Sequence, residues 1–166
     1  MMNYRSIEIC AGAGGQALGL EQAGFKHLAL VENDPHACAT LRLNRPQWNV
    51  LEMDVRDFSG MSYRNIELLA AGIPCPPFSV AGKQLGPNDE RDLFPEVIRL
   101  VGEVQPQAVM IENVRGLLDS VFDNYRSMIT RQIESYGYRA FWTLLNASDF
   151  GVPQLRPRTL FVALRP

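Results

Sequence analysis

The sequence predicts an α/β fold, with a doubly wound, mainly parallel sheet and an antiparallel hairpin at the C-terminal edge of that sheet. Short apolar runs rich in β-forming residues alternate with helical patterns along most of the chain, as they do in strand–helix–strand units. A glycine turn follows the first apolar run, where a strand passes into a helix. Two β-rich runs joined by a proline-containing loop close the sequence. The chain has 166 residues, which suits a single domain over 1–166.

Two strand–helix units are expected at the start of the chain. Residues 6–10 form the first strand, and the turn at 12–15 leads into a helix that stops at Gly24. The inner face of this helix is expected to carry Ala17, Leu18, Leu20 and Ala23. Residues 27–32 form the second strand. Asp34 and Pro35 then begin the next helix, because Asp is a good cap and Pro fits the first turn; its apolar positions are Ala37, Cys38 and Leu41.

The middle of the chain contains two strands and one unusual segment. Residues 50–53 form a short strand that ends at Asp54, and residues 66–71 form the next strand. The segment from Gly72 to Asp92 is rich in proline and glycine. Long loops of this kind in compact domains are usually functional or disordered, so we expect more than a passive connection here.

The last part of the chain completes the sheet. We expect a helix over 93–104, a buried strand over 108–111 that ends at Glu112, and a helix over 120–135. The β-rich runs at 139–145 and 159–164 then pair as the antiparallel hairpin.

Composition limits the classes of function. The formal net charge is −2 and the pI is about 5.7, which argues against a strongly basic coat for nucleic acid but allows a local basic groove. Near the C-terminus, arginines outnumber acids. The single acid is Asp149, and the arginines are Arg139, Arg156, Arg158 and Arg165. Arginine suits bidentate contacts to phosphates and bases.

Other classes are not expected. No apolar run approaches the ~20 residues of a membrane helix, and no secretory signal precedes the first strand, so we expect a cytoplasmic protein. Three cysteines without a CxxC pair indicate reduced thiols. His27 and His36 lack partners at metal-ligand spacing, so no metal is expected.

The glycine turn predicts a nucleotide-like ligand. Gly12-x-Gly14-x-x-Ala17 follows a strand, and Glu32 lies twenty residues after Gly12, as in dinucleotide-binding folds where an acid accepts bonds from ribose hydroxyls. The pattern fits NAD and S-adenosylmethionine alike, and the alternative is a tight turn without a ligand. The further glycine at Gly15 and a second acid, Asp54, favour the methyl donor.

A cysteine between prolines predicts a nucleophile. Pro74 and Pro76 fix the backbone on both sides of Cys75, which suits a group whose angle of attack matters. Cys10 and Cys38 are better explained as small apolar core residues. Glu112 lies beside the cysteine loop if the two strands are neighbours; the alternative for Glu112 is a helix cap or a surface carboxylate.

Four motifs together resemble the DNA cytosine-5 methyltransferase family. They are Glu8-Ile9-Cys10-Ala11-Gly12-Ala13-Gly14-Gly15, Pro74-Cys75 with Phe78-Ser79, Glu112-Asn113-Val114, and Gln154-Leu155-Arg156-Pro157-Arg158. Their order and spacing agree with the family through nearly the whole chain. The chain departs from the family at Cys10, where Phe is frequent, and at Glu8, where Asp is usual.

The resemblance implies a Rossmann-like fold that binds S-adenosylmethionine, with S-adenosylhomocysteine as product. It implies double-stranded DNA as the partner, as in restriction–modification systems. The implied catalytic residues are Cys75, Glu112, Arg156 and Arg158. The implied cofactor-binding residues are Cys10, Ala11, Gly12, Gly14, Gly15, Glu32, Asn33, Asp54, Val55, Gly72, Pro74 and Leu93. The implied DNA contacts are Ser79, Lys83 and Gln84.

The resemblance also implies the chemistry. Cys75 adds to C6 of a cytosine and makes C5 nucleophilic, while Glu112 holds the N3 and amino edge of the base. Arg158 or the amides of the cysteine loop lower the pKa of the thiol. The base must leave the duplex stack. We expect the loop over 80–92 to close over it, with Gly82 and Gly86 as hinges, and to be mobile without DNA.

Two parts of the family's proteins have no counterpart in this sequence: a target-recognition domain and a final helix that covers the cofactor side of the core. A natural split enzyme, a truncated gene product and a deliberately shortened chain all fit. In each case the sheet face that the helix would cover is expected to be apolar, and to meet a second chain or a second copy.

Alternatives remain at this point. A tRNA cytosine-5 methyltransferase carries the same motifs, and a catalytically idle module that binds S-adenosylmethionine fits a split or truncated enzyme. An NAD-dependent oxidoreductase explains the glycine turn and Glu32 but leaves the cysteine loop unexplained.

Overall fold

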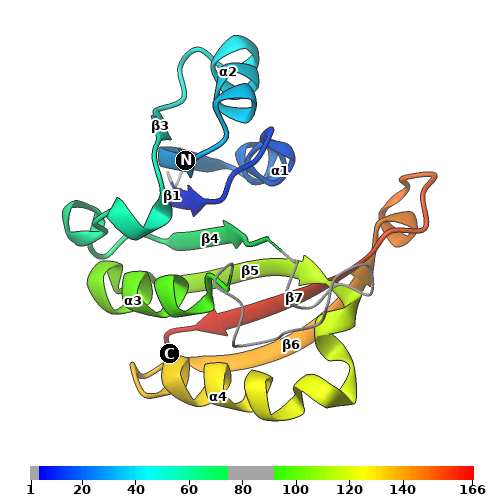
Figure 1. Ribbon diagram of the computed structural model, residues 1–166. Helices are drawn as coiled ribbons and strands as arrows, with labels where there is room; N and C mark the ends of the chain where they lie inside the picture. Colours follow the sequence, from blue (N-terminus) through cyan, green and yellow to red (C-terminus); the bar gives the residue numbers. More distant parts are fainter. Residues whose placement is uncertain (1–3, 75–91) are drawn as a thin grey trace.

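A seven-stranded sheet organises the molecule (Figure 1). The computed structural model describes residues 4–74 and 92–166. The strands are β1 Tyr4–Ile9, β2 Phe25–Glu32, β3 Val50–Glu52, β4 Leu68–Gly72, β5 Ala108–Val114, β6 Arg139–Asn146 and β7 Pro157–Leu164. The α-helices are α1 Gly15–Gln22, α2 Pro35–Asn44, α3 Phe94–Val104 and α4 Asp123–Glu134. Short 3-10 helices are η1 Val55–Asp57, η2 Met61–Tyr63, η4 Arg115–Leu118, η5 Ser120–Phe122 and η6 Ala147–Phe150.

The strand order is β3-β2-β1-β4-β5-β7-β6. The first five strands of this order pair in parallel, whereas β7 pairs antiparallel with both β5 and β6. The predicted fold class is therefore confirmed, including the hairpin at the edge. The chain runs outward from β1 through β2 to β3 and then returns to place β4 on the other side of β1, so the switch point lies between β1 and β4.

Helices pack on both faces of the parallel part of the sheet. The larger core joins β1 and β2 to α3 and α4, with Ile9, Phe94 and Ile129 among its fully buried members. Strand residues of the opposite parity, such as Leu30, pack with Leu41 of α2 on the other face. Since alternate side chains of a strand point to opposite faces, these are two layers of helix around one sheet.

The antiparallel part of the sheet is covered differently. Its face on the α3 and α4 side is buried through Phe161 and Ala163. On the opposite face, Val162 is half-buried, and Phe141 and Leu164 are 50% and 49% exposed. Phe141 pairs with Val162 in the register of β6 and β7. Among the described residues, these side chains form an apolar face without a covering helix.

Several predicted boundaries were wrong in detail. Strand β5 continues to Val114 because β7 offers pairing partners as far as Arg158, so Glu112 lies within the strand instead of after it. The predicted helix over 120–135 begins with the short helix η5, and α4 starts at Asp123. Leu18 and Ala23 are exposed, because α1 turns only Ala17 and Leu20 inward.

Candidate active site

Two adjoining cavities lie at the carboxyl ends of β1 and β4, on either side of the switch point. The first has a volume of about 200 Å³ and the second about 460 Å³. Both are lined by Cys10, Gly12 and Gly72. Ligands of open α/β sheets bind at this position, so the two cavities together form the candidate site.

Most of the expected cofactor residues line the first cavity. Its lining consists of Cys10, Gly12, Val31, Glu32, Asn33, Met53, Asp54, Val55, Arg56, Gly72, Pro74 and Leu93. Val31, Met53 and Arg56 were missed by the sequence reasoning, and Arg56 carries the only one of these three side chains that is charged. The second cavity is lined by Glu8, Cys10, Ala11, Gly12, Gly15, Gln16, Gly72, Glu112 and Arg156. The structure thus brings the glycine turn, the acids and two expected catalytic residues to one edge of the sheet.

The glycine turn has a backbone that few residues tolerate. Cys10, Gly12 and Gly14 have φ values of 53°, 54° and 93°, and the last of these favours glycine strongly. A Cβ atom on Gly14 would lie 2.6 Å from Cδ2 of Leu41. Gly14 lines neither of the two cavities. Its place in the structure indicates that it shapes the turn and lets α2 approach.

Glu32 holds the turn in place. Its Oε2 accepts a hydrogen bond from the amide of Gly12 at 2.7 Å, and its Oε1 accepts from the amides of Asn33 and Asp34 at 2.9 Å. The residue is only 9% exposed. The carboxylate therefore connects the end of β2 to the turn after β1 while it faces the cavity. The sequence predicted its place but not this bond.

Asp54 forms the far end of the first cavity. It caps η1 by accepting from the amide of Arg56 at 2.9 Å, and its Oδ2 lies 3.0 Å from Nη1 of the same residue. The pair is partly exposed, so the ion pair itself stabilises the fold little. Its effect is to orient the carboxylate at the cavity wall.

Burial changes the chemistry of two groups in the second cavity. Glu8 is 1% exposed, and neither carboxylate oxygen has a hydrogen-bond partner among the described residues. Burial raises the pKa of Glu8 to about 8. Burial, together with Glu32 and Asp54, raises the pKa of Cys10 to about 12. A thiol with a raised pKa is a poor nucleophile near neutral pH, so Cys10 is not a candidate for the nucleophile.

Glu112 and Arg158 form an ion pair across β5 and β7. Nε of Arg158 lies 2.7 Å from Oε1 of Glu112. In register, Glu112 stands beside Gly72 of β4, so the expected adjacency of the two strands is confirmed. Arg156 lines the same cavity as Glu112 and is exposed, while its amide donates to Oδ1 of Asn146 at 2.9 Å.

The remaining expected residues cannot be placed. Cys75, Ser79, Lys83, Gln84 and the greater part of the predicted closing loop lie outside the described residues. Within 4–74 and 92–166, no group of three or more His, Cys, Asp or Glu side chains is arranged to hold a metal ion. In the same part of the chain, none of the helices has the length and apolar character needed to cross a bilayer.

Comparison with known proteins shows the family of the chain. A model of C-5 cytosine-specific DNA methylases matches residues 4–166. The chain belongs to this family. It is 66% identical to the Type II methyltransferase M.NgoMIV of Neisseria gonorrhoeae, over 99% of this chain and 53% of that protein. It is 52% identical to M.NaeI of Lentzea aerocolonigenes, over 99% of this chain and 41% of that protein. The chain thus spans about half the length of these curated methylase relatives.

Solved structures agree with the methylase fold. A DNA modification methyltransferase encoded within an E. coli prophage superposes with a TM-score of 0.84 at 28% identity, over 98% of this chain and 47% of that one. A DNMT2 protein of Spodoptera frugiperda superposes with a TM-score of 0.80 at 24% identity, over 98% of this chain and 50% of that one. The second likeness is one of fold alone.

Proposed function

We propose that the protein transfers a methyl group from S-adenosylmethionine to C5 of cytosine in double-stranded DNA. One observation carries the proposal: the Glu112–Arg158 pair, the glycine turn and the buried acids meet at one edge of the sheet, in a chain of the cytosine-5 methylase family. An oxidoreductase that uses NAD would leave the Glu112–Arg158 pair without a role.

The described residues fit the cofactor. Glu8 offers two buried oxygens without a partner among the described residues, and a cationic ligand such as an ammonium or a sulfonium satisfies a buried carboxylate. Glu32 is placed to accept from ribose hydroxyls, and Asp54 from an adenine amino group. When bound, S-adenosylmethionine supplies an electrophilic methyl group. Both acids line the first cavity, next to the cavity that contains Glu8.

The chain's own residues would carry out the remaining chemistry. The thiolate of Cys75 adds to C6 of the cytosine, and Glu112 favours protonation at N3 as the bond forms. C5 would then bond to the methyl carbon as its bond to the sulfonium sulfur breaks, which leaves S-adenosylhomocysteine, and the N3 proton would return to Glu112. A base, water in our proposal, removes the C5 proton, and Cys75 leaves as the ring regains its double bond. Arg158 would keep Glu112 oriented through their ion pair, and Arg156 would help to position the base.

The target base must leave the helix stack to reach this cavity, at a cost of a few kcal/mol. Ser79, Lys83 and Gln84 are the proposed backbone contacts on the DNA. The bases that define a recognition sequence would be contacted by protein outside this chain.

A methyl-transfer assay tests the proposal. The protein is incubated with S-adenosylmethionine and either duplex DNA or tRNA, and 5-methylcytosine is measured by mass spectrometry. We expect product in DNA, and none in DNA when Cys75→Ala replaces the wild type. Product in tRNA alone would favour the RNA methyltransferase. Calorimetric binding of S-adenosylhomocysteine without product in either nucleic acid would favour the idle cofactor-binding module, and calorimetric binding of NAD instead would favour the oxidoreductase.

We further propose that a second protein chain, with the part of the relatives that this chain does not match, covers the apolar face. The exposed Phe141 and Leu164 support this proposal, because exposed apolar patches of this kind mark interaction sites. Sedimentation of the protein over a range of concentrations, with and without Phe141→Ser and Leu164→Ser, tests it. Concentration-dependent association that the two changes abolish would favour a second copy. The companion chain is a separate polypeptide with the part of the relatives that this chain does not match. The proposal would be contradicted if the protein stayed strictly monomeric and if Phe141→Ser and Leu164→Ser left its affinity for the companion chain unchanged.

A further inference from the structure

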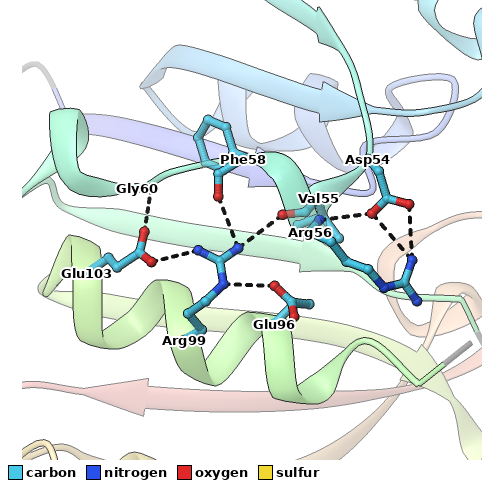
Figure 2. A network of polar contacts seen from close by, with 8 residues as sticks. All are labelled: Asp54, Val55, Arg56, Phe58, Gly60, Glu96, Arg99 and Glu103. Atoms are coloured by element: carbon cyan, nitrogen blue, oxygen red, sulfur yellow. Dashed lines mark hydrogen bonds and ion pairs between the residues drawn. The ribbon is translucent and has the colours of Figure 1, made fainter. Parts of the chain in front are cut away.

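An arginine on α3 holds the segment that forms one wall of the first cavity. Nη2 of Arg99 donates to the carbonyl oxygens of Val55 and Phe58, at 3.1 and 3.0 Å (Figure 2). Val55 lines the cavity, directly after Asp54. The amide of Phe58 also donates to the carbonyl of Val55. One guanidinium nitrogen therefore binds both ends of the short helix η1.

Two carboxylates on the same helix fix this guanidinium. Nε of Arg99 lies 2.8 Å from Oε2 of Glu96, and Nη1 lies 2.7 Å from Oε1 of Glu103. The other oxygen of Glu103 accepts from the amide of Gly60 at 2.7 Å. Figure 2 shows the resulting network, which connects α3 to three points of the chain after β3. A lysine ammonium lacks the planar fork that such divided contacts require.

The same helix also contributes to the lining of the cavity. Leu93 lines the cavity and caps α3 at its N-terminus, and Phe94 begins the helix in the core. Arg99 therefore joins two walls of one cavity: the start of its own helix and the segment with Asp54 and Val55. These contacts hold the segment of Val55 against the helix that carries Leu93.

An ordinary ion pair between two turns of one helix does not join separate parts of a cavity lining. Glu–Arg pairs three or four residues apart on a helix surface stabilise the helix only slightly. Arg5 makes comparable contacts elsewhere: it binds the carboxylate of Glu67 and the carbonyl of Asn65. These lie at the amino ends of β1 and β4, away from both cavities. Arg5 is therefore a matched control for Arg99.

We propose that Arg99 is a positioning residue for the adenosine end of the cofactor site. It keeps Asp54 and Val55 at the spacing that the bound cofactor needs, without touching the cofactor itself. This inference rests on the proposed function, since it takes S-adenosylmethionine as the ligand of the first cavity.

The test compares three variants by calorimetric titration with S-adenosylhomocysteine. Arg99→Gln is expected to raise the Kd about tenfold. A change of this size corresponds to the loss of about one hydrogen bond made by a charged group. Glu103→Gln keeps the arginine and is expected to raise the Kd less, in the same direction. Arg5→Gln is expected to leave the Kd unchanged. In methyl transfer, Arg99→Gln should raise the KM for S-adenosylmethionine while kcat at saturating cofactor stays near that of the wild type.

The titrations distinguish a failure of the positioning role from a failure of the proposed function. A Kd for Arg99→Gln equal to that of Arg5→Gln, in a folded protein, overturns the positioning role and leaves the proposed function standing. If Arg99→Gln fails to fold, Glu103→Gln decides: an unchanged Kd overturns the inference, and a raised Kd supports it. A wild-type protein that binds no S-adenosylhomocysteine overturns the proposed function, and the inference with it.

Discussion

The parallel and antiparallel parts of the sheet differ in how completely the described part of the chain covers their faces. In the parallel part, helices pack on both faces, and Glu32 meets three backbone amides within a few residues of the cavity. In the antiparallel part, one face leaves Phe141 and Leu164 about half exposed. The Glu112–Arg158 pair lies at the border between the two parts.

This difference predicts that cofactor binding and catalysis depend on different parts of the sheet. The two cavities proposed to bind the cofactor are built largely from strand ends of the parallel part, so cofactor binding should depend on contacts that the described chain supplies. The proposed catalysis needs groups from both parts, since Glu112 and Arg158 lie on β5 and β7. Changes at the border should therefore reduce catalysis more than binding, and changes in the parallel part should reduce binding first.

The largest effect is expected at the border. Glu112→Gln removes the group that we propose favours protonation at N3, and general acid–base groups contribute about 10²–10⁴-fold to rate. We expect kcat to fall by about this factor, while the Kd for S-adenosylhomocysteine stays close to that of the wild type. Glu52→Gln, which removes an exposed carboxylate paired with Arg42, is the control. Retention of most of the activity in Glu112→Gln would contradict the assigned role.

A change in the parallel part should affect binding and stability together. Glu32→Ala leaves the amides of Gly12, Asn33 and Asp34 without their acceptor, and each unsatisfied buried group costs about 1–3 kcal/mol. We expect a lower melting temperature and a Kd for S-adenosylhomocysteine raised by more than about tenfold. Glu21→Ala, which removes a carboxylate on α1 that pairs with Arg45 at the end of α2, should spare binding. Equal losses of affinity in both variants would refute the assignment.

The turn itself predicts a smaller effect, on stability alone. Gly14→Ala places a Cβ at φ 93°, 2.6 Å from Leu41 and 3.3 Å from Trp48. Overpacking of this kind costs about 1–3 kcal/mol. Gly19→Ala, in α1 with no atom near the added Cβ, should stabilise the protein by up to about 1 kcal/mol. Urea denaturation of both variants measures the contrast, and equal midpoints would show that the turn is looser than described.

The smallest expected effect is a slope with pH. Burial raises the pKa of Glu8 from 4.5 to about 8, so between these values the folded state binds more protons than the unfolded state. The stability contributed by protonated Glu8 is full below the unfolded pKa and is lost as pH rises toward 8.

The melting temperature of ligand-free protein should therefore decline from pH 5 to pH 8, and Glu8→Gln should flatten the decline. Glu67→Gln is the control, because the hydrogen bond from Arg5 lowers the pKa of Glu67. Its contribution changes only at more acidic pH. An identical slope in wild type and Glu8→Gln would show that Glu8 is ionised in the folded protein.

The sequence predicted those parts of the fold that depend on local pattern. The alternation of strands and helices, the antiparallel hairpin, and the places of Glu32 and Asp54 at the ends of β2 and β3 followed from local pattern alone. The Glu112–Arg158 pair did not, because it depends on the register of β5 against β7. A slip of one residue would turn one partner to the other face.

Contacts between distant segments were likewise beyond local pattern. Arg99 meets carbonyl groups 44 and 41 residues earlier in the chain, and its sequence neighbourhood indicates only a helix ion pair. Glu32 binds the amide of Gly12, although the sequence suggested only that both contact a ligand. In both cases the tertiary fold supplies the partner, and spacing along the chain does not reveal it.

Trapping of one turnover tests the central claim most directly. The protein is incubated with S-adenosylmethionine and duplex DNA that contains 5-fluorocytosine, in which fluorine at C5 blocks the final elimination. We predict a covalent adduct at Cys75, located by peptide mass spectrometry, that requires the cofactor, persists in Cys38→Ala and is lost in Cys75→Ala. An adduct at another residue, or none while S-adenosylhomocysteine binds in calorimetry and a companion chain is supplied, would contradict the proposed cytosine-5 methyl transfer.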